Sequence, residues 1–458
     1  MAEAANFDIF VIGGGQAGPP LASDLAQAGI RVALAERKDL GGSCVNFGCT
    51  PTKAAIASAR VAHLARRSAE FGVRIPVVDI DFAAVIERAR KIAITSRSAL
   101  DRRMEASENP KLFRGHARLD GKVGEAFRIR LGNEAITAHR VVLDTGTRSA
   151  IPPIPGLENI PFIHAGNWLD ATTLPDHLAI IGGGAIGLEM AQFYRRMGSR
   201  VTVIEFGDQI AGHEDPDVAQ ALQALLEAEG IEFRLRTAVA AIEADRDGVA
   251  VRLGKDGSAR LQASRVFVAT GRRPNTDDLG LETVGVATTK QGIIEVDERL
   301  ATNVKGIWAA GDVRGGPQFT HTAWDDYRVL KSQLTGDASR TTRRVVPYAI
   351  FTDPELGRVG MTEAEARRAG HSIKIGRFDM RDSGKAFEIG EDRGLIKVVI
   401  DAGTNLILGA AVLAVEGAEL VHDYVDLMNA RAPYTVIRDA VHIHPTLAEA
   451  VQSAVAEI

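Results

Sequence analysis

The 458-residue chain has only two cysteines, Cys44 and Cys49. Four-cysteine sets and mixed Cys/His sets are therefore absent, which argues against a metal site built on soft ligands. No apolar run reaches the roughly 20 residues that a membrane-spanning helix needs, so no membrane partner is expected. The net charge is −5 and there is no basic block, which argues against nucleic acid as the main partner.

The chain also lacks the layout of a signal peptide, because a short polar segment leads directly into the apolar run at residues 7–12. Together with the two cysteines, this favours a reducing cytoplasm. At roughly 150 residues per domain, the length predicts about three domains. Glycine, in contrast, is abundant, with 46 residues, many of which fall in specific turns.

Both cysteines lie in the stretch Gly41–Lys53, just before a helical pattern. Two thiols and no others suggest a redox dithiol, although two buried, inert cysteines are an alternative. In a regular helix, residues five apart have Cα atoms roughly 8–9 Å apart, whereas a disulfide needs less than about 7 Å. If the two cysteines pair, the turn that holds them must be distorted, and Phe47-Gly48 is where it can bend.

The helix that follows the cysteines is expected to run from about Thr52 to Arg67. Its positive N-terminal end would then point at the turn that holds the two thiols. A helix N-terminus favours a thiolate, so we expect the pKa of a cysteine in this turn to be lowered.

The N-terminal segment has the pattern of a dinucleotide-binding unit. Residues 7–12 form an apolar strand pattern, a GxGxxG turn follows at Gly13, Gly15 and Gly18, and a helix is expected from Leu21 to Gly29. A second strand ends at the acid Glu36, 23 residues after the first glycine. The glycines allow a pyrophosphate to approach the helix N-terminus, and the acid holds a ribose hydroxyl.

The same pattern occurs a second time, after the proline-rich connector at 151–156. A strand at 177–181 leads into the glycines Gly182, Gly184 and Gly187, and the following strand ends at Glu205, again 23 residues after the first glycine. Two such units in one chain suggest two different dinucleotides that meet between domains.

The rest of the chain reads as a mixture of helices and strands, so the fold class is α/β. The predicted helices lie at 52–67, 81–106, 362–369, 416–429 and 433–440. The predicted strands lie at 111–118, 126–131, 135–143, 266–268, 306–310, 345–350, 373–379, 394–400 and 406–414.

Four further motifs complete the pattern: Thr145-Gly146, Thr270-Gly271, Ala309-Ala310-Gly311-Asp312 and the terminal His444-Pro445-Thr446 with Glu449. With the two GxGxxG units and the cysteine stretch, they come in an order that resembles the flavoprotein disulfide reductases with two dinucleotide domains. That family includes dihydrolipoamide dehydrogenase, glutathione reductase and mercuric reductase. The resemblance covers nearly the whole chain.

The resemblance implies a fold with two Rossmann-like domains and a C-terminal α+β dimerisation domain. The FAD-binding and central region would comprise 1–150 and 276–343, the NAD(P)-binding domain 151–275 and the dimerisation domain 344–458. It further implies a homodimer whose active site is shared across the interface.

The resemblance also assigns roles to single residues. Cys49 would lie beside the flavin and Cys44 would be the outer thiol that meets the substrate, while His444, oriented by Glu449, would be the acid/base for the dithiol of the other subunit. Lys53 and Glu189 resemble the ion pair near the flavin N5. The residues that would bind FAD are Gly13, Gly15, Gly18, Glu36, Lys53, Thr145, Gly146 and Asp312. The residues that would bind the nicotinamide dinucleotide are Gly182, Gly184, Gly187, Glu205 and Gly271.

Glu205 bears on the choice of nicotinamide cofactor. A carboxylate accepts a hydrogen bond from the ribose 2′-hydroxyl and repels a 2′-phosphate, and the residues from Phe206 to Glu214 include no arginine. We therefore expect NADH rather than NADPH.

The substrate is less well defined by the sequence. The chain has no cysteine after Cys49, whereas mercuric reductases carry a C-terminal pair. The stretch Phe319–Arg328 resembles flavoproteins of reactive-chlorine stress, and Asp144 departs from the alanine that commonly precedes Thr-Gly in the family. Three hypotheses stay open: a reductase of disulfides or oxidised thiols, a reductase of metal ions or oxidants that uses the same dithiol, and a non-enzymatic flavin redox sensor.

Overall fold

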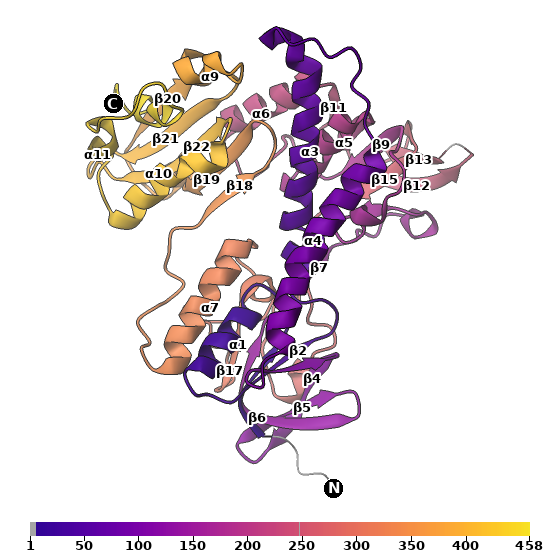
Figure 1. The fold of residues 1–458 in the computed structure, drawn as a ribbon, viewed down its shortest axis with the longest axis vertical. Helices are drawn as coiled ribbons and strands as arrows, with labels where there is room; N and C mark the ends of the chain where they lie inside the picture. The colour runs from indigo at the N-terminus through magenta and orange to yellow at the C-terminus, as the bar shows by residue number, and fades with distance from the viewer. Residues whose placement is uncertain (1–5, 247) are drawn as a thin grey trace. The chain divides into compact units, whose positions relative to one another are not determined.

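The computed structural model describes residues 6–246 and 248–458 (Figure 1). The chain forms two compact units, each built from three segments. The first unit runs to Ala54 and continues with Glu87–Ala150 and Arg272–Arg344. The second unit comprises Ala55–Ile86, Ile151–Gly271 and Val345–Ile458. The three-domain division expected from the sequence is finer than this and stays a prediction.

A seven-stranded sheet forms the centre of the first unit, with the order β3-β2-β1-β6-β5-β4 and β17 paired to β6. The pairs among β1, β2, β3, β6 and β17 are parallel, whereas β4, β5 and β6 form an antiparallel meander. The strands are β1 (Asn6–Ile12), β2 (Val32–Glu36), β3 (Lys111–Arg114), β4 (Ala117–Val123), β5 (Ala126–Leu131), β6 (Glu134–Leu143) and β17 (Ile307–Ala309).

Two helices cover one face of this sheet and lie side by side in Figure 1: α1 (Gly18–Gln27) and α7 (Thr320–Thr335). Leu21 and Leu25 of α1 and Leu330 of α7 are fully buried in the same apolar cluster as Ile9 and Val11 of β1. The apolar runs of β1 and β2 are therefore buried on both faces, as parallel strands under helices require. A short antiparallel pair, β7 (Thr147–Ser149) and β16 (Arg272–Pro274), completes this unit.

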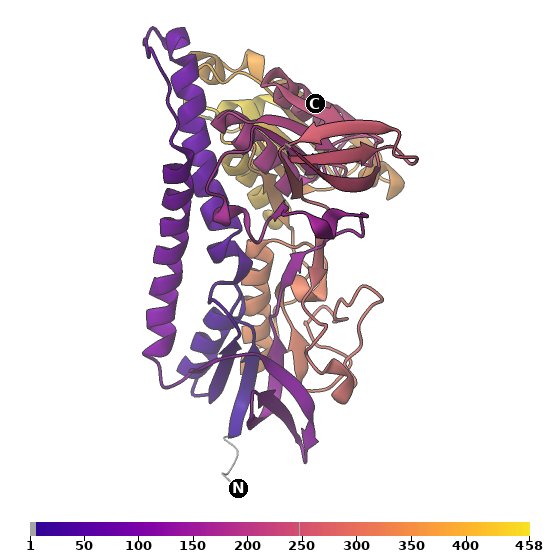
Figure 2. The same cartoon turned by 90° about the vertical axis from the view of Figure 1, so that its right-hand side faces the viewer.

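The second unit contains a parallel five-stranded sheet of the order β11-β10-β9-β15-β8. Its strands are β8 (Ile163–His164), β9 (His177–Ile181), β10 (Arg200–Ile204), β11 (Ile231–Arg234) and β15 (Arg265–Val268). The helices α5 (Ala185–Met197) and α6 (Pro216–Ala228) connect β9, β10 and β11. A three-stranded antiparallel sheet, whose hairpin is seen at the right of Figure 2, is formed by β12 (Val239–Asp245), β13 (Gly248–Leu253) and β14 (Ala259–Ala263).

The C-terminal segment of the second unit forms an antiparallel sheet of the order β18-β19-β22-β21-β20. The strands are β18 (Pro347–Ile350), β19 (Glu355–Gly360), β20 (Ile373–Asp379), β21 (Leu395–Asp401) and β22 (Ile407–Ala414). The helices of this segment are α8 (Glu363–Arg368), α9 (Gly384–Glu388), α10 (Gly417–Ala430), α11 (Thr435–Arg438) and α12 (Ala448–Ser453). Tyr424 of α10 and Val451 of α12 are buried in one core with β21 and β22.

The two long helices α3 (Cys49–Arg67) and α4 (Phe82–Glu105) are side by side at the left of Figure 2. The guanidinium of Arg88 donates to the carbonyl of Ala54 over 2.6 Å, which links the two helices in the first unit. None of the helices in the described residues is long and apolar enough to cross a membrane.

Most elements predicted from the sequence are present within a few residues of the expected bounds. The predicted strand at 111–118 is two strands, because Gly115 has a φ of +152° that breaks the extended chain. The sequence reading missed α6, α7, β19 and the sheet of β12, β13 and β14. The helix α1 begins at Gly18, earlier than expected. Its prolines occupy the first turn, where a backbone N–H would have no hydrogen-bond partner within the helix.

Candidate active site

The two cysteines lie on either side of a break between two helices. The short helix α2 (Gly42–Asn46) holds Cys44, and α3 begins at Cys49. The Gly48 amide donates to the Ser43 carbonyl over 2.6 Å, and a Cβ at Gly48 would lie 2.8 Å from that oxygen. The expected bend at Phe47-Gly48 is therefore confirmed. The expected helix start at Thr52 was wrong, because Cys49 itself stands at the N-terminus of α3.

Both cysteines are free thiols, with Cys44 half-buried and Cys49 exposed. The pKa of Cys44 is raised, mainly by its hydrogen bond with Cys49 and to a smaller extent by its burial. The lowered cysteine pKa expected from the helix N-terminus is thus wrong for Cys44. Cys44 therefore holds its proton more tightly than a free thiol does.

Thr320 is a contact of the dithiol that the sequence reading did not identify. Its Oγ1 lies 3.3 Å from the Sγ of Cys49, 271 residues away in the chain. Thr320 is the first residue of α7, and the neighbouring rings of Phe319 and His321 are stacked 5.3 Å apart. The resemblance of Phe319–Arg328 to flavoproteins of reactive-chlorine stress was the only sequence signal for this segment, and it did not indicate a contact with Cys49.

A chain of polar contacts connects α2, the helix that holds Cys44, to Asp312, which is predicted to bind the cofactor. The Arg272 guanidinium donates to the Thr147 hydroxyl over 2.6 Å and lies 3.4 Å from the Ser43 hydroxyl. The Thr147 hydroxyl in turn donates to the Asp312 carboxylate over 2.7 Å. Asp312 is thus held in place by groups from β7 and β16, and Arg272 lies within ion-pair distance of it, at 3.5 Å.

The first GxGxxG turn has the close approaches that a dinucleotide turn requires. A Cβ at Gly13, whose φ is +113°, would lie 2.2 Å from the Asp144 carbonyl, and a Cβ at Gly18 would lie 2.2 Å from the Gly13 carbonyl. The Glu36 carboxylate accepts from the Gly14 amide over 2.7 Å and from the Lys38 amide over 2.8 Å. The turn, the helix N-terminus of α1 and the acid at the end of β2 therefore fit FAD.

The Thr145-Gly146 turn lies next to these glycines, at the end of β6. Asn275 closes the turn, because its side-chain amide donates to the Thr145 carbonyl and its backbone amide donates to the Gly146 carbonyl. Gly146 has a φ of +63°, which glycine adopts readily. The binding of FAD by Thr145 and Gly146 stays a prediction.

The second turn repeats this geometry in the second unit. A Cβ at Gly182, whose φ is +111°, would lie 2.5 Å from the Ala269 carbonyl, and a Cβ at Gly187 would lie 2.0 Å from the Gly182 carbonyl. No atom lies within 4 Å of a Cβ built at Gly184, so the middle of the turn is open. The Glu205 carboxylate accepts from the Gly183 and Gly207 amides, as Glu36 does in the first turn. Gly271, with a φ of +113°, is the last residue of the middle segment of the second unit.

Lys53 and Glu189 belong to different units, so their expected ion pair stays a prediction. Lys53 is half-buried in the first turns of α3, which belong to the first unit, and its charge favours ionisation of Cys44. Glu189 is buried on α5 of the second unit, with 5% of its surface exposed. The backbone amide of Phe351 donates to its carboxylate over 3.0 Å.

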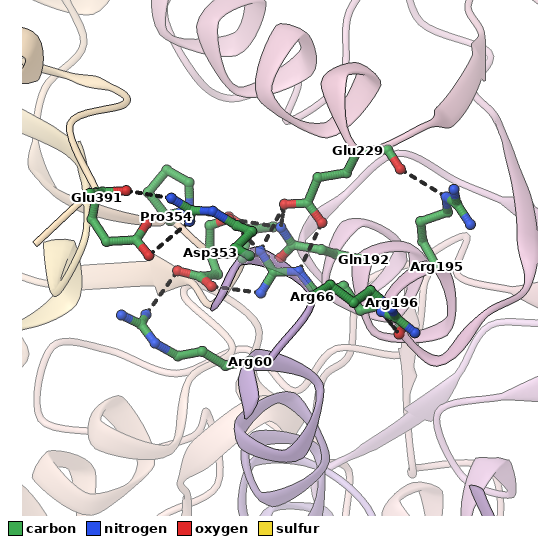
Figure 3. A network of polar contacts seen from close by, with 12 residues as sticks. Arg60, Arg66, Gln192, Arg195, Arg196, Glu229, Asp353, Pro354 and Glu391 are labelled. Carbon is green, nitrogen blue, oxygen red and sulfur yellow. Dashed lines mark hydrogen bonds and ion pairs between the residues drawn. The ribbon is translucent and has the colours of Figure 1, made fainter. Parts of the chain in front are cut away.

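A buried polar network fixes the segment that contacts Glu189 (Figure 3). Arg196, two turns after Glu189 on α5, donates to the Asp353 carboxylate over 2.6 Å and to the Glu229 carboxylate over 2.7 Å. Gln192 exchanges hydrogen bonds with the backbone of Asp353 in both directions. The three residues of one α5 face thereby hold residues 351–353 in place.

Arginines of α3 also contribute to this network. The Arg60 guanidinium donates to Asp353 over 2.8 Å, and Arg67 contacts Glu391 over 3.1 Å. Burial disfavours the charge on Asp353, but the guanidiniums of Arg196 and Arg60 outweigh it and hold the pKa of this carboxyl below its ordinary value. Asp353 is therefore a buried anion that depends on its arginine partners.

His444 and Glu449, 395 residues or more after Cys49, form the expected pair. The Nδ1 of His444 lies 3.1 Å from the Glu449 carboxylate, which also accepts from the Thr446 amide. The hydrogen bond from the Thr446 amide and, to a smaller extent, the hydrogen bond with His444 lower the pKa of Glu449. The imidazole is 77% exposed, so its outer face is open to a partner or substrate.

Comparisons with known proteins place the chain in a family. Residues 7–326 match the family model of the pyridine nucleotide-disulphide oxidoreductases, and residues 346–455 match the dimerisation domain of the same family. The chain belongs to this family: it is an FAD- and NAD(P)H-dependent disulfide oxidoreductase and an enzyme. The non-enzymatic hypothesis is therefore wrong.

Two kinds of relative match the chain almost from end to end. It is 33% identical to the probable pyridine nucleotide-disulfide oxidoreductase RclA of Escherichia coli over 97% of both chains, and 33% identical to a dihydrolipoyl dehydrogenase of Cupriavidus necator over 98% of this chain and 97% of the relative. A solved Cu(II) complex of RclA, a flavoprotein induced by HOCl, has a TM-score of 0.88, with 33% identity, and covers 96% of this chain and 98% of that chain.

The network around Asp353 gives a first prediction. Arg196→Met should destabilise the protein by about 3–5 kcal/mol, because it leaves Asp353 and Glu229 buried without their main cation. The measurement is thermal unfolding followed by circular dichroism. Arg234→Met is the matched control, since Arg234 is 55% exposed and reaches Glu232 only over 3.9 Å; a loss of stability as large as that of Arg196→Met would contradict the prediction.

Proposed function

We propose that the enzyme uses NADH to reduce small disulfides or oxidised thiols through Cys44 and Cys49. The cysteine pair carries this proposal, because Cys49 is exposed at the N-terminus of α3, and a helix N-terminus stabilises a thiolate. Two free thiols also suit a reducing compartment, so we propose a cytoplasmic location. The decisive experiment is steady-state NADH oxidation with lipoamide, glutathione disulfide, hypothiocyanite, Hg(II) and Cu(II) as acceptors.

The two cysteines would divide the reaction between them. FAD, when bound, supplies the two-electron link between NADH and the cysteine pair. In the dithiol form, the Cys44 thiol passes its proton to Nε2 of His444 of a second copy as its sulfur attacks one sulfur of the substrate disulfide. The other substrate sulfur leaves as a thiolate and takes that proton up. The Cys49 thiolate then attacks the sulfur of Cys44, which forms the Cys44–Cys49 disulfide and releases the second half of the substrate as a thiolate that takes a proton from solvent. Two electrons pass from the cysteine pair to the substrate.

His444 of a second copy would move the proton in this sequence. The Glu449 carboxylate holds its Nδ1, which leaves Nε2 free to protonate the departing thiolate. Val441 and Ile443, beside His444, are apolar and 100% and 79% exposed. These exposed side chains and the dimerisation domain support a homodimer in which each copy completes the site of the other.

A reductase of metal ions is the second candidate, because RclA was solved as a Cu(II) complex. In the described residues no group of three or more His, Cys, Asp or Glu side chains could hold a metal ion. A metal ion would therefore bind to the dithiol itself, as substrate. Turnover with Cu(II) or Hg(II) and none with any disulfide would favour this candidate over the first.

Cys44→Ser tests the division between the two sulfurs. The variant should keep reduction of its flavin by NADH, whereas turnover with a disulfide should fall by at least about a hundredfold, because the attacking sulfur is gone. Stopped-flow absorbance of the flavin and steady-state assays measure the two quantities. Val61→Ala, at an exposed position of α3, is the control; normal disulfide turnover by Cys44→Ser would remove Cys44 as the outer thiol.

Glu205 should determine the preference for NADH. Glu205→Gln keeps the size of the side chain but removes the charge that repels a 2′-phosphate, so the ratio of kcat/KM for NADH to kcat/KM for NADPH should fall by roughly tenfold. Asp208→Asn, at an exposed position nearby, should leave the ratio unchanged. A wild-type enzyme that prefers NADPH would contradict the assignment.

His444→Gln should slow disulfide turnover by about 10²–10⁴-fold while FAD binding stays normal, because a general acid is lost. A point variant is preferable to a truncation, since Val451, Ala454 and Val455 belong to the core of the second unit. His371→Gln is the matched control, because His371 forms a similar pair with Asp401 over 2.8 Å. Equal activities of the two variants would exclude His444 from the reaction.

A further inference from the structure

Asp144 is a buried carboxyl in the middle of the predicted FAD turn. It directly follows β6, is 5% exposed, and its Oδ2 accepts from the Gly18 amide over 2.7 Å. A Cβ at Gly15 would lie 3.0 Å from Oδ2, and a Cβ at Gly311 would lie 3.1 Å from Oδ1. The carboxyl group therefore fills the space between the GxGxxG turn and the turn that leads into Asp312.

The surroundings of this carboxyl are acidic. In the part of the chain that the structure describes, the carboxyl group of Asp144 forms no ion pair and accepts one hydrogen bond, from the uncharged Gly18 amide. Burial, together with the charges of Asp312, Glu36 and Asp326, outweighs the opposing effect of the Gly18 hydrogen bond and raises the pKa of Asp144 well above its ordinary value.

The arginines that contact Asp312 and Asp326 are engaged with those two carboxylates. Arg314 and Arg344 contact Asp326 over 2.7 and 2.6 Å, and Arg272 lies 3.5 Å from Asp312. Helix α1 begins with Gly18, Pro19 and Pro20 and contributes no charged side chain to this point. A bound pyrophosphate would add further negative charge, so an ionised Asp144 would repel it.

The second dinucleotide turn shows whether the backbone turn requires a carboxyl group at the residue before Thr-Gly. Ala269 precedes Thr270-Gly271, as Asp144 precedes Thr145-Gly146. The Ala269 carbonyl lies against Gly182 in the same way that the Asp144 carbonyl lies against Gly13. A Cβ at Gly187 would lie 3.5 Å from the Ala269 methyl group. The same backbone turn is therefore built with a methyl group, and the carboxyl of Asp144 is not required to form it.

We propose that Asp144 is a neutral carboxylic acid in the FAD site, where it accepts from the Gly18 amide and offers its own O–H as a donor to the pyrophosphate. This inference depends on the proposal that Gly13, Gly15 and Gly18 hold FAD. A neutral donor strengthens the binding of an anion, whereas a carboxylate at the same place weakens it. The affinity for FAD should therefore fall as Asp144 ionises at rising pH.

The test is titration of FAD into the apoprotein from pH 6 to pH 9, followed by flavin fluorescence. Asp144→Asn keeps both an acceptor and a donor, so its Kd should equal that of the wild type at pH 6. Asp144→Ala removes the donor, so its Kd should rise by about tenfold or more. The ratio of wild-type Kd to that of Asp144→Asn should stay constant or rise with pH. A ratio that falls with pH, or tight binding by Asp144→Ala, would overturn the proposal.

Infrared spectroscopy of the apoprotein gives a second readout that needs no activity. The difference between wild type and Asp144→Asn at pH 7 should contain the C=O band of a protonated carboxylic acid, and carboxylate bands alone would overturn the proposal. Thermal unfolding of each apoprotein identifies a variant that fails to fold.

Glu36→Ala separates the inference from the site on which it depends. If this variant also binds FAD normally, the first turn does not hold the cofactor. If it loses FAD while Asp144→Ala does not, the site stands and only the assignment of Asp144 fails.

Discussion

The break between α2 and α3 is the constraint on which the dithiol depends. A continuous helix would hold the sulfurs of Cys44 and Cys49 on separate turns, too far apart to pair. At Gly48 the chain instead comes so close to the Ser43 carbonyl that a side chain would not fit. The same break starts a new helix at Cys49, so one backbone irregularity brings the sulfurs together and gives one of them a helix N-terminus.

The sequence predicted those parts of the site that depend on local backbone geometry. Gly13 and Gly182 have φ values near +110° and lie against the carbonyl of a strand end, and only glycine fits such a position. The acids Glu36 and Glu205 could be predicted for the same reason, because each ends the strand beside its turn. The strand pattern on either side then determined the fold class.

Contacts between distant segments could not be predicted in this way. Thr320 lies next to Cys49 only because α7 packs beside α1 on the sheet, and Arg196 meets Asp353 across 157 residues of sequence. Nothing in the pattern of either segment indicates its partner. The start of α3 was missed for a related reason: a helix that begins at a cysteine after glycine has no Ser, Thr, Asp or Asn side chain to cap it.

The two dinucleotide turns show that one backbone can support two chemistries. The first and third glycines of each turn make the same backbone contacts, and each turn has an acid that accepts from two amides. Each turn also lies against a residue that precedes Thr-Gly. They differ at the residue before Thr-Gly, which is an aspartic acid at 144 and an alanine at 269. If the two turns hold the two cofactors as we propose, a difference in their binding arises from side chains, since the backbone is nearly the same. A cofactor that is kept through many turnovers gains from an additional buried donor, whereas one that must leave after each turnover does not.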